Sequence, residues 1–148
     1  MNVRIGIDYV RFHHLLTAYY REGEDADTPQ EQLDSFIRYL YDLMEKGVIS
    51  GAAAWEQEPV GFVLWAMDCE ELPFSNKPGY GTVLEIGILP EFRGKGYGGQ
   101  LVAFAESKLG PVKKYICAYG PAEAFWKKCG YAESGQIAEN GLKIFVKG

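Results

Sequence analysis

One stretch of the chain, residues 84–101, decides the fold, and it reads LEIGILPEFRGKGYGGQL. Its first part belongs to an apolar run over residues 82–88, which predicts a strand that ends before Pro90. Four of the six residues from 94 to 99 are glycine. The apolar spacing that follows predicts a helix over residues 96–109. The stretch therefore predicts a strand, a bend and a helix whose first turn is rich in glycine.

The glycines predict a ligand site. Each glycine in a helical turn costs about 1 kcal/mol relative to alanine, so four of them indicate that something other than helix stability sets this turn. Without Cβ atoms, the free N–H groups at the helix start can surround an anion, and the helix dipole favours negative charge there. Arg93 and Lys95 add positive charge to a chain whose net charge is −5. We predict a phosphate or pyrophosphate cradle; the alternative is a glycine-rich turn without a ligand.

Two common phosphate motifs do not fit. Residues 94–99 satisfy Gly-x-Gly-x-x-Gly, but a dinucleotide site has this motif directly after a strand, with an acidic residue about 20 positions further on. Here a proline-containing bend intervenes, and no Asp or Glu lies between Glu106 and Glu123. A Walker A loop needs Ser or Thr after its lysine, whereas Lys95 precedes Gly96.

The rest of the chain predicts a mixed α/β (α+β) fold. Strands are expected over residues 3–7, 48–56, 60–67, 82–88, 115–119 and 142–146, with a further short strand near residue 131. Helices are expected over residues 9–21, 28–47, 96–109 and 121–130. Thr28 is the predicted N-cap of the second helix, with Pro29 at its first position and Glu31 completing a capping box. Antiparallel pairs come first and strand–helix–strand crossovers follow, so we expect a mostly antiparallel sheet with helices on both faces.

Composition limits the class of protein. A chain of 148 residues predicts one domain over residues 1–148. The net charge of −5 disfavours nucleic-acid and membrane-surface binding, and no apolar run is long enough to span a membrane. The first residues lack a signal-peptide stretch, and the three cysteines are odd in number, so we expect free thiols and a cytoplasmic location. His13 and His14 face no Cys/His cluster, so no metal site is expected.

The bend resembles a known family. Residues 93–98, Arg-Gly-Lys-Gly-Tyr-Gly, resemble the Arg/Gln-x-x-Gly-x-Gly/Ala signature of the GNAT N-acetyltransferase superfamily, and the typical Pro-Glu-Phe precedes them. Residues 122–131 are similar to the family's second motif, Ala-x-x-Phe-Tyr-x-x-x-Gly-Phe, but have Trp126 where the family has tyrosine. The resemblance covers nearly the whole chain.

The resemblance implies a GNAT-like acyl-CoA N-acyltransferase fold and transfer of the acetyl group of acetyl-CoA to an amine of a small molecule. The amine would attack directly in a ternary complex. Strands four and five would diverge to admit the coenzyme. The family's coenzyme-binding positions correspond here to Ile86, Gly87, Ile88, Arg93, Gly94, Lys95, Gly96, Tyr97, Gly98 and Gly99. Members of the family often form dimers, which leaves a homodimer open.

The chemistry of amine acetylation needs a base, because an alkyl amine is mostly protonated at neutral pH. Glu85, a carboxylate in an apolar strand, is the candidate base or proton relay; the alternative is a strand residue in an ion pair. The family's usual acid is absent because tryptophan has no acidic proton in this range. Tyr119 is the candidate acid, with Tyr131 as an alternative. Two further alternatives are that the reaction needs no acid and that the protein is not a catalyst. Cys117 and Cys129 are interpreted as buried apolar residues and not as nucleophiles.

The acceptor is poorly specified by the sequence. Acidic residues cluster in the two loops that line the acceptor side in the family, which suggests a cationic amine or simply a solvated surface. These residues are Glu22, Glu24, Asp25, Asp27, Asp68, Glu70 and Glu71. Six aromatic residues of the first two predicted helices are candidates for an acceptor pocket or for the core: Phe12, Tyr19, Tyr20, Phe36, Tyr39 and Tyr41. The rival functions are a non-catalytic CoA-binding sensor and an interaction protein with a vestigial cradle.

Overall fold

The computed structural model describes residues 1–23 and 25–148, and in these residues one seven-stranded sheet has the order β1-β2-β3-β4-β5-β7-β6. The strands are β1 Asn2–Ile5, β2 Ser50–Trp55, β3 Pro59–Met67, β4 Gly81–Ile88, β5 Lys114–Ala118, β6 Ala132–Ile137 and β7 Lys143–Lys147. The helices are α1 Tyr9–Arg21, α2 Gln30–Glu45, α3 Tyr97–Leu109 and α4 Glu123–Lys128, with single 3-10 turns at Pro90–Phe92 and Gly120–Ala122. Neighbouring strands are antiparallel except β4 and β5. The predicted mixed, mostly antiparallel sheet is confirmed.

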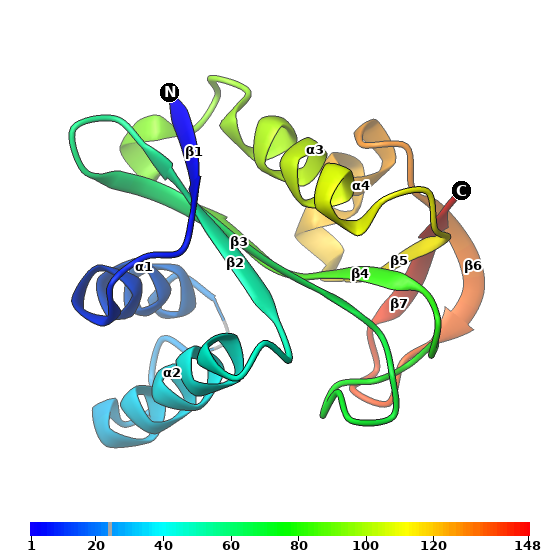
Figure 1. Cartoon of the computed structure of the whole chain (residues 1–148), viewed down its shortest axis with the longest axis horizontal. Coiled ribbons are helices and arrows are strands. Elements are labelled where there is room, and N and C mark those ends of the chain that lie inside the picture. The colour runs from blue at the N-terminus through cyan, green and yellow to red at the C-terminus, as the bar shows by residue number, and fades with distance from the viewer. Residues whose placement is uncertain (24) are drawn as a thin grey trace.

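Helices cover both faces of the sheet (Figure 1). On one face, α1 and α2 bury Phe12, Leu16 and Ile37 against the strands. On the other face, α3 and α4 enclose a second core that includes Leu101 and Phe145. Strand β3 contributes to both cores and is buried over all but its last residue, as its apolar sequence predicts. No helix in the described part of the chain has the length and apolar character needed to cross a membrane.

The helix ends follow the predicted capping rules in part. Asp8 caps α1 by accepting a hydrogen bond from the Arg11 backbone N–H at 3.1 Å, and Gly47 follows α2 in the left-handed conformation at φ +75°. The predicted capping box at Thr28 is wrong. The backbone of Pro29 is extended, so α2 begins at Gln30, and the Thr28 hydroxyl donates to the Asp25 carboxylate at 2.9 Å.

Strands β4 and β5 pair over only two residues. Gly81 pairs with Lys114 and Thr82 with Tyr115, after which β4 continues to Ile88 along β3 alone. A bulge in the same part of β4 leaves Leu84 without a partner, because Leu64 pairs with Glu85 while Trp65 pairs with Val83. The sheet is therefore open between β4 and β5 beyond Thr82, and this opening leads toward the glycine-rich bend.

Candidate active site

Glu85 lies on the α1 and α2 side of β4, at the start of the opening between β4 and β5. Its neighbours there include the ring hydroxyls of Tyr19 and Tyr20. Burial raises the pKa of Glu85 to about 7, the interaction with Tyr19 opposes this shift, and Asp25 adds to it. A carboxyl group with this pKa exists in both protonation states near neutral pH, which suits a group that takes up and releases a proton. None of the ion pairs among the described residues includes Glu85, so the alternative of a cross-strand ion pair is not supported.

Tyr119 directly follows β5 and is 46% exposed. The pKa of the Tyr19 phenol is raised by burial, by Glu85 and, to a smaller extent, by Tyr119, so the two tyrosines are close enough to interact. Glu85, Tyr19 and Tyr119 therefore gather around the opening between β4 and β5. The sequence identified Tyr19 as a candidate for an acceptor pocket or for the core, but its place on the apolar stripe of α1 did not indicate that it would lie beside Glu85.

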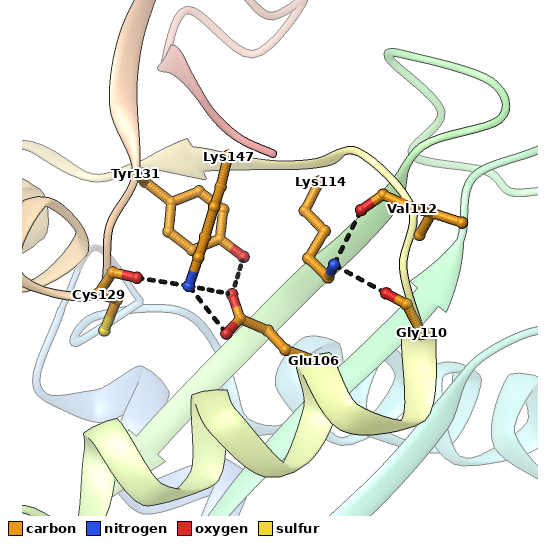
Figure 2. A network of polar contacts seen from close by, with 7 residues as sticks. All are labelled: Glu106, Gly110, Val112, Lys114, Cys129, Tyr131 and Lys147. Atoms are coloured by element: carbon orange, nitrogen blue, oxygen red, sulfur yellow. Dashed lines mark hydrogen bonds and ion pairs between the residues drawn. The ribbon is translucent and has the colours of Figure 1, made fainter.

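Tyr131, the alternative acid, is engaged elsewhere. Its hydroxyl donates to Glu106 Oε2 at 2.8 Å, and Lys147 Nζ donates to both oxygens of the same carboxylate (Figure 2). Burial and Glu106 raise the pKa of Tyr131. A phenol that is buried at the contact of α3 with β7 is a structural residue, so Tyr119 is left as the better placed of the two tyrosines.

The glycine-rich bend presents free backbone N–H groups. Within the described residues, no hydrogen bond is formed by the backbone N–H groups of residues 94–99, and the first bond of the helix is that from Gln100 N–H to the Gly96 carbonyl. Gly94 and Gly96 adopt φ +78° and +81°, a conformation that side-chain-bearing residues rarely adopt. A Cβ atom at Gly94, Gly96 or Gly99 would meet no heavy atom within 4 Å. Unpaired donors beside open space at a helix N-terminus fit a diphosphate.

The three longer side chains of the bend have partners within the protein. The Arg93 guanidinium donates to the Ile88 carbonyl at 2.9 Å and forms an ion pair with Glu22 at 2.8 Å. Lys95 Nζ lies 5.3 Å from the centre of the Phe92 ring. The Tyr97 hydroxyl donates to Glu56. The positive charge of Arg93 is thus largely used to hold the bend against α1, and the N–H groups are what the bend offers to a ligand.

Of the three predicted coenzyme-binding residues on β4, Ile86 keeps its backbone free of β5, whereas Ile88 and Gly87 are engaged within the protein. Ile86 packs on the α3 side of the sheet, and its backbone lies in the part of β4 that β5 does not pair with. The carbonyl of Ile88 is taken by Arg93. At Gly87, a Cβ atom would lie 2.7 Å from both Phe62 and Tyr19. Gly87 is therefore required for the packing of α1 on the sheet, independently of any contact with a coenzyme.

The segment of the second motif supports the bend from behind. Trp126 is 6% exposed and packs edge-on against the rings of Phe125 and Tyr131. The Phe125 ring would contact a Cβ atom at Gly98 at 3.0 Å, so α4 packs directly against the first turn of α3. The indole that replaces the family's tyrosine is thus a core residue.

A cavity of about 160 Å³ adjoins Glu85 on the side of α1 and α2. Its aromatic walls come from four residues in four different segments: Tyr20, Phe36, Phe74 and Tyr115. Polar groups line it at Asn76, Cys117 and Asn140. The sequence identified Tyr20 and Phe36 as candidates; the others come from the 68–80 loop, β5 and the turn before β7, where nothing in the local sequence marks them.

Other predicted acceptor-side residues lie outside this cavity. Phe12 is in the core, the Tyr41 hydroxyl donates to the Ile7 carbonyl, and Tyr39 packs against Phe74. Among the acidic residues, Asp68 is buried and accepts a hydrogen bond from Tyr115 at 2.7 Å, while Glu22 binds Arg93. Glu24 lies outside the described residues. None of the described acidic loop residues lines the cavity.

A larger, open hollow of about 860 Å³ lies between α1, the turn that joins β2 and β3, and the bend. Neither Glu85 nor Tyr119 lines it, so the two candidate catalytic residues face other parts of the molecule. Of the described residues, no three His, Cys, Asp or Glu side chains are grouped closely enough to hold a metal ion. Burial raises the pKa of the Cys117 and Cys129 thiols, which disfavours their thiolate forms.

Comparison with known proteins identifies the family. The model of the acetyltransferase (GNAT) family matches residues 9–131, which include α1, the bend and the second motif. The chain belongs to the acetyltransferase (GNAT) family. No curated protein matches the chain.

Solved structures of GNAT acetyltransferases share the fold. The PaiA N-acetyltransferase of Thermoplasma acidophilum, in complex with coenzyme A, has a TM-score of 0.71 at 15% identity, with 99% of each chain covered. A GCN5-related N-acetyltransferase of Ralstonia eutropha has a TM-score of 0.74 at 20% identity, covering 93% of this chain and 96% of its own. YhbS of Escherichia coli, in complex with CoA, has a TM-score of 0.69 at 17% identity, covering 99% of this chain and 79% of its own.

Proposed function

We propose that this GNAT protein is an N-acetyltransferase that transfers the acetyl group of acetyl-CoA to the amine of a small molecule. One observation carries the proposal. The bend at residues 94–99 offers unpaired N–H groups at the end of an opening between β4 and β5, and Glu85 lies beside that opening. Two of the structural neighbours were crystallised with coenzyme A, which supports the same use of the opening.

Residues 94–99 would hold the diphosphate of acetyl-CoA, and the unpaired part of β4 around Ile86 would lie along its pantetheine arm. Bound acetyl-CoA supplies a thioester whose carbonyl carbon a neutral amine attacks, with loss of the coenzyme thiolate. The chain's own residues manage the protons. Glu85, with its pKa of about 7, accepts a proton from the ammonium form of the acceptor and so exposes the nitrogen lone pair.

Tyr119 is the proposed donor to the leaving sulfur. Its exposed hydroxyl stands near the same opening, while Tyr131 and Trp126 are buried in the core. A positioned acid contributes about 10²–10⁴-fold, whereas a thiolate with a thiol pKa of about 8.5 can also leave unaided. Tyr119 therefore raises the rate without being indispensable. Over the whole reaction, one ammonium and one thioester become an amide, a thiol and a released proton.

The proposal is tested with CoA and a panel of amines. Calorimetry should detect CoA binding, and release of free thiol from acetyl-CoA should depend on an added amine. Binding of CoA without thiol release from any amine would favour a CoA-binding sensor. The observation behind this alternative is Trp126, which stands where the family has its acidic tyrosine. Absence of both heat and thermal stabilisation at millimolar CoA would overturn the proposal.

A further inference from the structure

The cavity beside Glu85 has a lining that selects among amines. It brings together α1, α2, the 68–80 loop, β4 and β5, and the side chains that face it are chiefly aromatic or aliphatic. Leu40 and Leu84 extend the apolar wall formed by Tyr20, Phe36 and Phe74. Hydrocarbon that packs against such a wall is removed from water, which favours binding. The cavity therefore suits an acceptor with an apolar body.

The charges in the cavity are few. Of the described residues that line it, Glu85 alone carries a carboxylate, and none carries an ammonium or guanidinium group. An acceptor with its own carboxylate would place that group near Glu85 with no cation to bind it. A second ammonium group would likewise lose water without gaining a carboxylate partner. Among the described residues of this lining, the one charged partner for an acceptor is therefore Glu85, which suits a single ammonium group.

A buried hydroxyl marks where the amine would lie. The Tyr20 side chain is nine-tenths buried, and its hydroxyl has no hydrogen-bond partner among the described residues. Tyr20 and Glu85 both line the cavity, and burial followed by Glu85 raises the pKa of this phenol, as expected for neighbouring groups. A buried polar group without a hydrogen-bond partner is unfavourable, so a ligand that hydrogen-bonds to it recovers free energy. An amine can bond to both the Tyr20 oxygen and the Glu85 carboxylate.

The size of the cavity limits the acceptor. Sites for drug-sized ligands measure about 300–1,000 Å³, and this cavity has about 160 Å³. It has room for one ring or a branched alkyl group and not for a large polycyclic or polysaccharide acceptor. Resting on the proposed function, we propose that the acceptor is a small primary monoamine with an aromatic or branched hydrocarbon body, held by Tyr20, Phe36, Leu40 and Phe74 with its nitrogen at Glu85.

Four probe amines separate the alternatives: 2-phenylethylamine, phenylalanine, spermidine and a short lysine peptide. The value of kcat/KM, measured by thiol release, should be at least tenfold higher for 2-phenylethylamine than for any other probe. Phenylalanine is the informative comparison, because it differs from 2-phenylethylamine only by a carboxylate. Calorimetry with each amine gives a readout that does not depend on turnover, and 2-phenylethylamine should bind most tightly.

The variant Phe36→Ala tests the cavity itself, since Phe36 lines it and is 40% exposed, so that the fold tolerates its loss. It should weaken 2-phenylethylamine binding about tenfold or more and leave CoA binding unchanged. Val10→Ala, at an exposed position of α1, should change neither. Preference for spermidine or the peptide, or unchanged amine binding in Phe36→Ala, would overturn this inference while the acetyltransferase proposal stands. Failure of CoA to bind would overturn both.

Discussion

At the scale of single residues, the candidate chemistry depends on two groups whose sequence neighbours say little about their surroundings. Glu85 is one carboxylate in an apolar strand, and its pKa of about 7 arises because the fold buries it, while the hydrogen bond from Tyr19 opposes this rise and Asp25 adds to it. Tyr119 follows β5 and Tyr131 lies between α4 and β6, so the sequence offers both as similar candidates. One is exposed at the opening, whereas the other is bonded to Glu106 in the core.

Glu85→Gln removes the proton acceptor without changing the shape of the side chain. We expect kcat/KM for an amine to fall about 10²-fold. In the wild-type protein, kcat/KM should rise with pH as Glu85 loses its proton near pH 7, because only the carboxylate accepts a proton. The glutamine variant should lack that inflection. Glu31→Gln, an exposed change at the start of α2, is the control, and an unchanged pH profile in Glu85→Gln would exclude Glu85 as the base.

Tyr119→Phe and Tyr131→Phe form a matched pair, since each removes one hydroxyl group. The first should lower kcat by about 10²-fold and leave the free energy of unfolding unchanged, because the Tyr119 hydroxyl is exposed. The second should lower the free energy of unfolding by about 1 kcal/mol through the lost bond to Glu106, with little change in kcat. Thiol release and urea denaturation measure the two effects. A wild-type kcat in Tyr119→Phe would mean that the thiolate leaves without an acid.

At the scale of elements, α3 connects the ligand site to the fold. Its first turn carries the glycines and packs on α4 through Gly98 and Phe125. Its last turns are tied to the C-terminal strands by Glu106, which accepts hydrogen bonds from Tyr131 and Lys147, while Lys114 Nζ donates to the carbonyls of Gly110 and Val112 just beyond the helix (Figure 2). Both ends of α3 are thus held while β4 and β5 diverge beneath it.

Gly99→Ala separates the ligand role of the bend from its folding role. A Cβ atom at Gly99 would meet no heavy atom within 4 Å, and the φ of Gly99 is not left-handed. Alanine should therefore leave the free energy of unfolding unchanged or raise it by up to about 1 kcal/mol. The added methyl group lies among the free N–H groups, and we expect the Kd for CoA to rise at least tenfold. Ala103→Gly, at an exposed position of the same helix, should show the reverse: lower stability and unchanged Kd. Calorimetry that gave equal Kd values for Gly99→Ala and wild type would remove Gly99 from the cradle.

Lys147→Met tests the network between α3 and β7. Lys147 Nζ donates to Glu106 at 3.0 Å and to the Cys129 carbonyl at 2.7 Å, and its loss leaves a half-buried carboxylate with Tyr131 alone. The free energy of unfolding in urea should fall by about 2 kcal/mol. Lys128→Met, an exposed change on α4, should stay within about 0.5 kcal/mol of wild type. Equal stability of the two variants would show that the network contributes nothing measurable.

At the scale of the whole molecule, the sheet consists of two halves that are joined by only two residue pairs between β4 and β5. Strands β1 to β4 carry α1 and α2, and strands β5 to β7 follow α3 (Figure 1). A ligand between the halves would supply hydrogen bonds that the strands themselves do not make. The proposed coenzyme site is thus the part of the sheet where β4 and β5 leave each other's backbone groups unpaired.

Bound CoA should protect the open part of β4. In the free protein, backbone amides of residues 83–88 that face the opening should exchange hydrogen faster than those of β3, and CoA should slow them selectively. At a hundredfold excess over Kd, CoA adds about 2.7 kcal/mol, which is roughly 5–10 °C in Tm for a chain of this length. A rise in Tm without protection at residues 83–88 would place the coenzyme elsewhere.

The sequence alone determined the elements and the bend. Asp8, Gly47 and the apolar spacing of α1 and α2 determine the helices through contacts over a few residues. The glycines at 94–99 allow the left-handed backbone and the open first turn that the bend has. Only the tertiary structure decided which groups meet. The early end of β4–β5 pairing and the cavity of Tyr20, Phe74 and Tyr115 depend on segments far apart in the chain. Even Arg93, the first residue of the predicted motif, uses its side chain on Glu22, because folding brings the end of α1 beside the bend. Local conformational preferences depend on residues that are neighbours in the sequence, whereas burial, pKa and cavity shape depend on contacts between residues that are far apart in it.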